Sequence, residues 1–569
     1  MRINDPGPKK FKVILALLPV IIFLGLFLYS FKSRDTMIWL FARTSYYFMF
    51  ALCMIWLIQL CRYLAVLDLA PGEFFKAYWP GLVLALAVTA VVFATVPVQF
   101  KILGDETNLL AVSQDMYYHK GAYIISMAKF YHGSLQVVDV SIPNRPLLFP
   151  FAINMVHSIL GYRPENVFIL NFILLFIFLA GVYVAIKKAI DNHTAVAGLF
   201  LILSYPIISI SATSGGYDLF STLLFALILT VFYQFLKSPD AQTLAFLWMS
   251  LLMFTNIRYE SCIFILIIGL AVLKYIKFSQ LKTAAHIYFL TPLLSLPFIW
   301  QRFLSQGTYE NPSHIPLFSA QSFIKHGKIF LQNFLNLNLD LPYSGMLNLA
   351  AVLIIGYGFK QIVTKKIKLT PIQKNFTITV LSCVTVIMVI VLSHHFGRYD
   401  RPTQARLFMY FSVFCALTPI FLKAIYPNWI SGKKLMVAAL VIFLFYHPVA
   451  GNHTFINNMV ITRIHQHAQK FLKNINDSDI LIISAYAGQY TALNYSAVTF
   501  NYANRHSQTL MAELKAHRYK KIFVFQEIDN TTNRPKWDNQ RLDPKFKLTA
   551  VEEIQVLNDR FLRISRLVI

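Results

Sequence analysis

One stretch of the chain, Val167–Ile186, decides the fold class: it reads VFILNFILLFIFLAGVYVAI and carries no charge. About 20 apolar residues in a helix cross a hydrocarbon core about 30 Å thick. The stretch must be helical, because lipid offers no hydrogen-bond partner to an unpaired backbone N–H or C=O group. It therefore predicts a transmembrane span, which ends where Lys187 and Lys188 begin the next loop.

Composition extends this prediction to most of the chain. Of the 569 residues, 57% are hydrophobic and only 14% are charged, and the mean hydropathy is +0.55. Soluble domains carry roughly 25% charged residues. The 50 Phe and 29 Tyr residues fit a protein whose aromatic rings gather at membrane interfaces. A soluble globular enzyme is excluded.

Cysteine placement and net charge exclude two further classes of function. All five cysteines lie in or beside apolar stretches, without CxxC or metal-ligand spacing, so neither a disulfide framework nor a zinc site is predicted. The net charge of +25 is assigned to short loops beside spans, where Lys and Arg set orientation and meet anionic lipid. We expect no nucleic-acid partner.

Apolar stretches recur along the chain and predict 13 spans. They are Val13–Phe31, Met37–Leu60, Trp79–Val98, Val167–Ile186, Ala195–Ala212, Asp218–Leu236, Ala241–Asn256, Ser261–Val272, Ala284–Trp300, Met346–Phe359, Asn375–Leu392, Leu407–Leu422 and Leu435–Tyr446. The first is preceded by basic residues but lacks a small-residue cleavage site, so we expect a retained span and not a removed signal peptide. The predicted fold class is α, a polytopic transmembrane helical bundle with a small C-terminal extramembrane α/β domain.

One more apolar segment, Pro146–Tyr162, is short and contains Pro150 and His157. Loop charge decides whether it spans. With a cytoplasmic N-terminus and no crossing here, 14 basic residues fall in the later cytoplasmic loops and seven in the opposite loops. The 14 are Lys187, Lys188, Lys237, Lys274, Lys277, Lys282, Lys360, Lys365, Lys366, Lys368, Lys374, Lys423, Lys433 and Lys434, and the seven are Arg258, Arg302, Lys325, Lys328, Arg398, Arg401 and Arg406. A crossing would invert this bias against the positive-inside rule, so we expect an interfacial helix on the outer face.

The predicted organisation has two parts. Residues 1–449 form a transmembrane module with a first outer loop at 99–166 and a second long outer loop at 302–345. Residues 450–569 form an outer-face, periplasmic α/β domain, in which Ile480–Ser484, Ala497–Phe500 and Lys521–Phe525 are β-rich and Ser507–His517 has a helical pattern. The chain is thus expected to be a multi-pass protein of the cytoplasmic (inner) membrane, with its N-terminus in the cytoplasm and its C-terminal domain outside.

Ionisable residues gather at the outer ends of the predicted spans. They are Asp105, Glu106, Asp115, His119, Lys120, Arg145, Asp218, Arg258, Glu260, His394, His395, Arg398, Asp400, Arg401 and Arg406. Such groups near a bilayer are costly, so a gathering of them on one side suggests a functional site. Simpler interpretations stay open: Asp105 and Glu106 as a solvated helix end, the arginines as interfacial anchors, and the two histidines as packing residues.

The order of these motifs resembles that of the C-type integral membrane glycosyltransferases, which use polyprenyl-phosphate sugars. The closest resemblance is to the protein O-mannosyltransferase and lipid A aminoarabinose transferase branch. The matching elements are Asp105-Glu106 at the start of the first outer loop, Arg145-Pro146-Leu147-Leu148-Phe149-Pro150 about forty residues on, Gly161–Asn166, and Ser214-Gly215-Gly216-Tyr217-Asp218 in a short outer loop. The match covers roughly residues 80–300 and, loosely, 390–425. The first two spans and the C-terminal domain lie outside it.

The resemblance implies transfer of a hexosyl or pentosyl group from a polyprenyl-phosphate donor, with inversion, on the outer face of the membrane. It implies catalytic roles for Asp105 as general base and for Glu106 and Asp218 as its helpers. The donor phosphate would meet Arg398, Arg401, Arg406 and Arg258, because guanidinium forks suit phosphate oxygens. Asp115, His119, Lys120, Arg145 and Tyr217 would position donor or acceptor, and the 302–345 loop could close as a lid. The acceptor stays open as a lipid, a glycan or a protein, and relatives act with or without a divalent metal ion.

Two other classes stay open. A transporter or lipid flippase shares the number of spans, but the sequence shows no inverted repeat and few charges inside the spans. An outer-face glycan ligase or polymerase would share the arginines, but it should lack the acidic pair at the start of the first outer loop.

Overall fold

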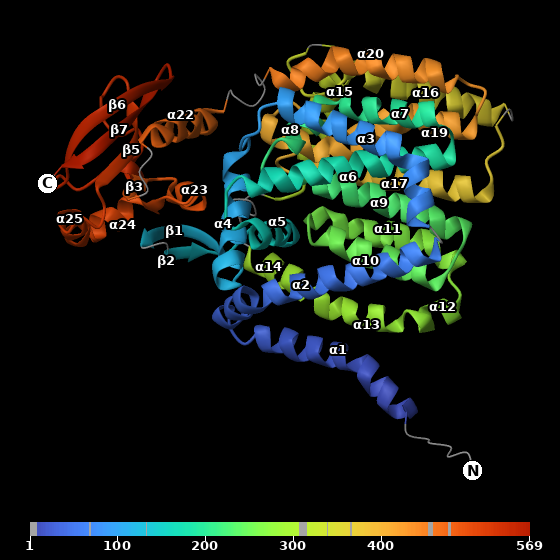
Figure 1. The fold of residues 1–569 in the computed structure, drawn as a ribbon, viewed down its shortest axis with the longest axis horizontal. Coiled ribbons are helices and arrows are strands. Elements are labelled where there is room, and N and C mark those ends of the chain that lie inside the picture. Colours follow the sequence, from blue (N-terminus) through green and yellow to red (C-terminus); the bar gives the residue numbers. More distant parts are fainter. Residues whose placement is uncertain are drawn as a thin grey trace.

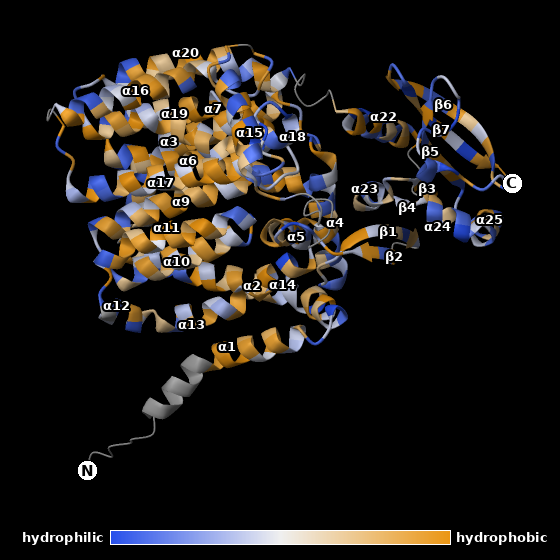
Figure 2. Cartoon of the chain, turned by 180° about the vertical axis from the view of Figure 1, so that it is seen from behind, coloured by the Kyte–Doolittle hydropathy of each residue, from blue (hydrophilic) through white to orange (hydrophobic). Residues whose placement is uncertain are grey.

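The computed structural model describes residues 8–67, 70–131, 134–305, 316–337, 339–364, 367–452, 459–475 and 479–568. A bundle of helices makes up most of the chain, and a domain built on a β-sheet lies beside one end of it (Figure 1). We call the bundle end beside the sheet domain the near end, and the opposite end the far end. Apolar residues cover the bundle helices along their length (Figure 2), as the sequence predicts for helices in lipid.

The bundle helices follow the predicted apolar stretches. They are α1 (Pro8–Ser30), α2 (Arg34–Val66), α3 (Pro71–Thr95), α6 (Asn166–Ala189), α7 (Asn192–Leu203), α8 (Pro206–Ala212), α9 (Asp218–Lys237), α10 (Ala241–Thr255), α11 (Cys262–Val272), α12 (Phe278–Thr283), α13 (Ala285–Leu294), α14 (Leu296–Leu304), α16 (Gly345–Val363), α17 (Pro371–Ser393), α19 (Met409–Ile425) and α20 (Gly432–Gly451).

The predicted count of 13 spans is not confirmed. Among the described residues, eight helices are long and apolar enough to cross a membrane, and the bent pair α7–α8, with 77° between its halves, makes nine. Of the other four predicted spans, α1 is counted as apolar only over Leu18–Ser30, α10 and α11 are shorter helices, and the fourth is divided between α13 and α14. Prolines explain two of the interruptions, since Pro206 begins α8 and Pro297 lies in the first turn of α14.

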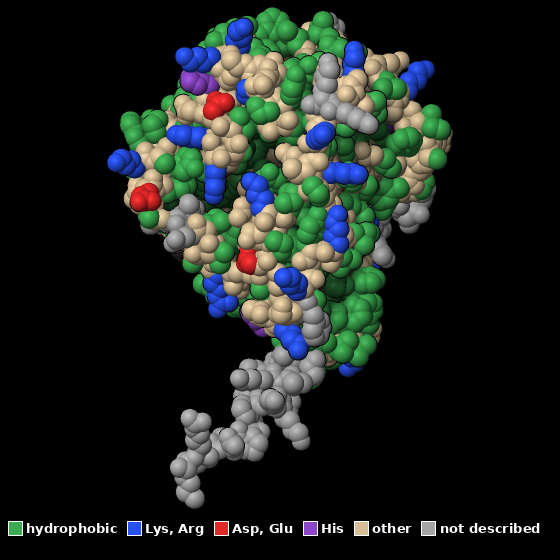
Figure 3. All heavy atoms as spheres, turned by 90° about the vertical axis from the view of Figure 1, so that its right-hand side faces the viewer, with side chains coloured by type: hydrophobic (Ala, Val, Ile, Leu, Met, Phe, Trp, Pro, Cys, Tyr) green, Lys and Arg blue, Asp and Glu red, His purple; other side chains and the backbone are tan. Residues whose placement is uncertain are grey.

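Two hydrogen bonds made by side chains of α6 and α12 lie at the far end of the bundle. Lys187 Nζ donates to Ala77 O at 2.6 Å, and Gln280 Nε2 donates to Pro239 O at 2.8 Å. Figure 3 views the molecule from this end and shows Lys and Arg side chains spread over it, with few Asp or Glu among them. The excess of Lys and Arg that the sequence places in one set of loops thus corresponds to the far end of the bundle.

Two helices, α4 (Leu103–His119) and α5 (Leu148–Leu160), lie between the bundle and the sheet domain (Figure 1). The buried imidazole of His157 ties them together, since its Nε2 is 3.2 Å from Ser113 Oγ and its Nδ1 is 2.9 Å from Asn166 Nδ2 at the start of α6. The segment Pro146–Tyr162 is therefore a helix of 13 residues that is not among the eight long spans. Its place on the outer membrane face stays a prediction.

The C-terminal domain is a mixed sheet of seven strands with helices packed on it, which confirms the predicted α/β character. The strand order is β2-β1-β4-β3-β5-β7-β6, with β3 parallel to β4 and β5 and the other pairs antiparallel. Its elements are α22 (Val460–Ile475), β3 (Ile480–Ser484), α23 (Ala487–Ala492), β4 (Ser496–Val498), α24 (Phe500–Arg505), α25 (Ser507–Lys515), β5 (Lys521–Asp529), β6 (Lys547–Leu557) and β7 (Arg560–Val568). The three β-rich runs correspond to β3, β4 and β5, and the helical pattern corresponds to α25.

The sequence did not predict that this sheet takes two strands from the first outer loop. β1 (Ile124–Tyr131) and β2 (Ser134–Ser141) form a hairpin whose first strand pairs with β4 at Ala128↔Ala497. A buried ion pair, Lys129 Nζ to Glu513 Oε2 at 2.9 Å, fastens the hairpin to α25. The division at residues 449 and 450 stays a prediction, but the two parts are interlocked through this hairpin.

The second long loop contains a helix, α15 (Ala320–Phe334), which covers the near end of α17. Its His326 Nδ1 lies 3.0 Å from Leu392 O, and Phe318 pairs with His394 in an isolated bridge. Part of the predicted lid, residues 306–315 and 338, lies outside the described residues.

Candidate active site

Six side chains of alternating charge form a continuous row at the near end of the bundle. In order they are Arg145, Asp105, Arg406, Asp218, Arg258 and Glu260. Arg145 Nη2 lies 3.1 Å from Asp105 Oδ1, and Arg406 donates to the other oxygen of Asp105. Arg406 Nη1 then reaches Asp218 Oδ2 at 3.3 Å.

The row continues from Asp218 to its last member. Arg258 Nη1 lies 3.1 Å from Asp218 Oδ1, and its Nε donates to Glu260 Oε1 at 2.7 Å. The central members are the most enclosed, because the side chains of Asp218 and Arg258 are each 3% exposed and that of Arg406 is 7% exposed. Each central carboxylate is therefore held by two guanidinium groups in a site with little water.

Helix ends place these side chains. Asp105 lies in the first turn of α4, and Asp218 is the first residue of α9. The partial positive charge at a helix N-terminus stabilises a carboxylate there by about 0.3–1 kcal/mol. Arg406 begins a single 3-10 turn (Arg406–Phe408) that leads into α19, and Arg258 precedes the 3-10 turn Tyr259–Ser261. The side chains of both arginines thus extend from these turns toward the N-termini of α4 and α9.

Neighbouring guanidiniums keep the carboxyl groups of Asp105 and Glu260 ionised. Burial alone would raise the pKa of Asp105, but the guanidiniums of Arg145 and Arg406 outweigh it and hold that pKa well below its usual range. At Glu260 burial also opposes ionisation, and Arg258 lowers the pKa. In this arrangement Asp105 is a weak proton acceptor. It can act as a general base only if its pKa rises.

Among the described residues, Glu106 makes no ion pair with the row, and it ties two loops together through backbone N–H groups. It is 1% exposed, and its carboxylate accepts backbone N–H groups of Lys101 at 2.8 Å, Ile102 at 3.1 Å and Gly215 at 3.0 Å. Burial raises the pKa of Glu106, against these three donors, which favour the carboxylate. The approach at Gly215 is close, since a Cβ there would lie 2.7 Å from the Phe100 ring. A larger residue would push the two loops apart.

A second buried charge supports the same contact. Lys101 is 1% exposed, and its amine donates to Ile210 O at 2.8 Å and to the hydroxyl of Thr213. Burial lowers the pKa of Lys101 to about 7, although Glu106 opposes that shift. The segment before α4 is thereby anchored to the C-terminal end of α8.

Tyr217 and Asn171 complete the site. The ring of Tyr217 is buried and faces the guanidinium carbons of Arg258 at 5.7 Å and Arg406 at 5.9 Å, within cation–π range. Asn171, the only amide within Val167–Ile186, donates to Ser214 O at 2.7 Å and Gly216 O at 3.1 Å. It joins α6 to the loop that carries Tyr217.

Other residues singled out in the sequence lie elsewhere. Arg398 is half-buried and its Nε donates to Asp400 Oδ1 at 3.0 Å, and Arg401 is exposed. Asp115 and His119 pair with each other at 3.0 Å at the opposite end of α4 from Asp105. Lys120 follows them, with its amine 5.3 Å from the ring centre of Tyr46. The structure therefore brings Arg145, Arg258 and Arg406 together with Asp105 and Asp218, but not these five residues.

Sequence reasoning missed the groups that hold Arg145 in place. Gln301 is buried, and its Nε2 donates to Pro143 O at 2.8 Å and to the Tyr259 hydroxyl at 2.6 Å. That hydroxyl in turn donates to Asn144 O. The signal for Gln301 was a polar side chain near the end of a mostly apolar helix, but its two partners, Tyr259 and Pro143, lie 42 and 158 positions away in the sequence.

A divalent metal ion would need several carboxylate, imidazole or thiolate ligands close together. Among the described residues no three His, Cys, Asp and Glu side chains lie close enough together to hold one. Asp105 and Asp218 each face two guanidiniums, whose charge would repel a cation. These residues do not fit a metal, and none of the steps proposed below uses one.

No protein-family model matches the chain, and no curated protein matches it. The solved structures that match include ArnT from Cupriavidus metallidurans in the apo state, with a TM-score of 0.42 and 12% identity over 86% of this chain and 98% of that chain. The Archaeoglobus fulgidus oligosaccharyltransferase matches with a TM-score of 0.44 and 11% identity over 80% of this chain and 70% of that chain. ArnT from Cupriavidus metallidurans bound to undecaprenyl phosphate matches with a TM-score of 0.38 and 12% identity, over 85% and 97%.

These proteins are of the kind that the order of motifs resembles, polyprenyl-phosphate-dependent membrane glycosyltransferases. With TM-scores below 0.5, the likeness assigns no residue and no activity to this chain.

Proposed function

We propose that the chain is a membrane glycosyltransferase that moves a sugar from a polyprenyl-phosphate donor to an acceptor, with inversion at the sugar carbon. The observation that carries this proposal is the row itself. Three guanidiniums surround two carboxylates at the N-termini of α4 and α9, on the motifs that resemble those of the family. Such a site offers both a base for a hydroxyl group and cations for a phosphate.

The donor phosphate is proposed to bind Arg145 and Arg406. Guanidiniums bind phosphate oxygens through paired, charge-assisted hydrogen bonds, and these strengthen in an enclosed site. In the present arrangement both arginines are engaged with Asp105. An entering phosphate therefore competes with that carboxylate. Because Arg145 contacts both oxygens of Asp105 and Arg406 contacts one, the carboxylate is released only when both guanidiniums turn to phosphate.

This exchange resolves the weakness of Asp105 as a base. Its pKa is low because two guanidiniums face it. When they turn to phosphate, burial dominates and the pKa of the carboxyl group rises toward the range that a general base needs. Asp105 then accepts the proton of the attacking hydroxyl as a bond forms from its oxygen to the sugar carbon. The carbon–oxygen bond to phosphate breaks with its electron pair, and the leaving phosphate keeps the added negative charge beside the arginines.

The remaining residues position these groups. Asp218 holds Arg406 and Arg258 at a fixed separation, and Tyr217 covers both guanidiniums. Glu106 fixes the start of α4 to the Gly215 loop and is assigned a positioning role, not a role in proton transfer. Arg398 and Arg401 are proposed to meet lipid headgroups or the donor as it enters.

The site is proposed to face the outside of the cytoplasmic membrane. The far end of the bundle carries the excess of Lys and Arg (Figure 3), which the positive-inside rule places in the cytoplasm. The near end, with the row and the sheet domain, then lies outside. A reporter fused after Gly451 should report an external location, and a cytoplasmic signal would overturn this orientation.

The function is tested by comparing Asp105→Asn with Asp115→Asn. Both changes remove one carboxylate from α4, but Asp115 pairs with His119 at the other end of the helix. In a strain without the gene, mass spectrometry of envelope lipids and glycans should show a missing sugar. The native chain and Asp115→Asn should restore it, and Asp105→Asn should not, at equal membrane levels. Restoration by Asp105→Asn would remove this residue from the mechanism, and an unchanged sugar profile in the deletion strain would overturn the transferase assignment.

A further inference from the structure

Helix α15 presents three different faces. His326, Ile329 and Phe330 pack inward, with the Phe330 ring 5.0 Å from that of Tyr399. Ile324 and Leu331, one helical repeat of seven apart, are 71% and 73% exposed and apolar. The third face is polar, with Gln321, Lys325, Lys328 and Gln332 at helical spacing and all exposed. A helix with adjacent exposed apolar and basic faces is typical of one that lies in a membrane interface.

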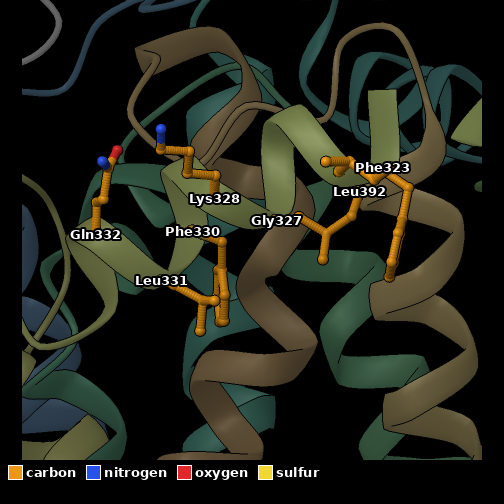
Figure 4. Close-up of a pocket in the computed structure, with 8 residues that line it drawn as sticks. Phe323, Gly327, Lys328, Phe330, Leu331, Gln332 and Leu392 are labelled. Atoms are coloured by element: carbon orange, nitrogen blue, oxygen red, sulfur yellow. The ribbon is translucent and has the colours of Figure 1, made fainter. Parts of the chain in front are cut away.

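A groove of about 610 Å³ runs along the boundary of these faces. It is lined by Phe323, Ile324, Gly327, Lys328, Phe330, Leu331, Gln332 and Leu392. In Figure 4 the amine of Lys328 and the amide of Gln332 point to the opposite side of the view from the side chains of Phe323, Phe330 and Leu331, of which Leu331 is 73% exposed. The groove is thus apolar inside and basic at its rim.

Gly327 is central to the groove. It lies between the turns that carry Ile324 and Leu331, and a Cβ built on it would meet nothing within 4 Å. A glycine inside a helix costs about 0.5–1 kcal/mol relative to alanine. The residue therefore leaves an open space where a side chain would otherwise fill the apolar face.

We propose that this groove binds one acyl chain of an anionic glycerophospholipid from the leaflet at the near end, whose phosphate meets Lys328 and Lys325. The open space at Gly327 admits a hydrocarbon chain, and the apolar lining residues match it. Lys328 lines the groove and Lys325 lies one turn before it on the same polar face, so the two supply charge complementarity to a single phosphate. A protein partner would leave this exposed apolar face in contact with lipid whenever the partner was absent, whereas a lipid is always present.

The site extends to the row through packed rings. Phe330 stacks on Phe408 at 6.0 Å, and Phe408 closes the 3-10 turn that begins with Arg406. Phe408 also meets Tyr399 edge-on at 4.9 Å. A lipid seated at Gly327 thereby stabilises the helix that covers the turn carrying Arg406.

The test uses the full chain in nanodiscs that contain a phosphatidylglycerol with a photoreactive group in one acyl chain. Peptide mapping after illumination should find a strong crosslink within residues 316–334 in the native chain. Gly327→Leu fills the groove and should reduce that crosslink about tenfold, which corresponds to the loss of one or two buried methylenes. Gly356→Leu, at an exposed glycine of α16 that also has open space, is the matched control and should leave it unchanged.

Headgroup selectivity is read in the same experiment. Each basic residue near an anionic lipid contributes about a fivefold preference, so Lys325→Ala with Lys328→Ala should lower the preference for phosphatidylglycerol over phosphatidylcholine by about 25-fold. Equal crosslinking in Gly327→Leu, or crosslinks spread evenly over the bundle, would overturn the proposal. Displacement of the probe by undecaprenyl phosphate, but not by unlabelled phosphatidylglycerol, would assign the groove to the donor and also overturn it. None of these outcomes depends on the transferase activity.

Discussion

Asp218 and Arg406 are neighbours in the middle of the charge row, and removing both leaves two complete ion pairs. Arg145 with Asp105 remains on one side and Arg258 with Glu260 on the other. Removing either one alone leaves a charge in excess among side chains that are 3–7% exposed. Breaking one partner out of a buried pair costs about 3–5 kcal/mol, because the other charge stays desolvated.

A double-mutant cycle with Asp218→Asn and Arg406→Met therefore measures how strongly the two charges stabilise each other. Each single variant should lose about 3–5 kcal/mol of stability, since an ion that was compensated becomes uncompensated. The double variant should be more stable than the sum predicts, with a coupling free energy of about 2–3 kcal/mol. Unfolding in detergent can be followed with a thiol-reactive dye, because Cys383 and Cys415 are buried in the native bundle.

A matched cycle with Asp105→Asn and Arg406→Met sharpens the test. It removes the same number and kind of charges, but it separates Arg145 from its carboxylate and leaves Asp218 and Glu260 around Arg258. Its coupling should be smaller than that of the first cycle. Equal coupling in both cycles, or none in the first, would refute the view that neutral adjacent pairs stabilise the row.

Three further predictions follow from individual contacts. When the pH is raised from about 7 to 10, the native chain should gain more stability against dye-detected unfolding than the Lys101→Met variant gains. The pKa of Lys101 in the folded state, about 7, lies below its value in the unfolded state, so the contribution of Lys101 to stability is lost as the pH falls toward 7. Gln301→Leu should lower transfer about 10–100-fold while donor-phosphate affinity falls with it, because Arg145 loses the support of the Pro143–Asn144 backbone, and an unchanged rate would show that Arg145 does not depend on it. Lys129→Met should loosen the β1–β2 hairpin and speed hydrogen exchange in residues 124–141 without changing exchange in α6, whereas uniform exchange across the chain would contradict a local role for the Lys129–Glu513 pair.

Hydropathy predicted most of the helices because each long apolar stretch has one stable conformation in lipid. The count of 13 spans is not confirmed where prolines interrupt the chain, as at Pro206 and Pro297, because composition does not report the length of each straight helix. The strands β3 and β5 were predicted because they are short, buried and apolar. The hairpin β1–β2 was not, because its strands alternate weakly and its partner strand, β4, lies over 350 residues away.

The candidate active site was likewise predicted only in part from the sequence. Asp105, Asp218, Arg258 and Arg406 could be selected from sequence, because ionisable groups near spans are costly. Their alternating order could not, since four of the five links in the row join residues 40 to 301 positions apart. The role of Glu106 was also hidden, because three backbone N–H groups decide it and backbone groups leave no mark in a sequence.

The hydrogen bonds from Asn171 to Ser214 and Gly216 also make bilayer thickness a variable of this site. Helix α6 has 24 residues and is about 36 Å long, somewhat more than the hydrocarbon core. A thinner bilayer makes such a helix tilt. Because Asn171 fastens the helix to the Tyr217–Asp218 segment, the tilt carries that segment with it and changes its distance from Arg406. Lipids of different chain length should therefore tune the reaction geometry without any change in the protein.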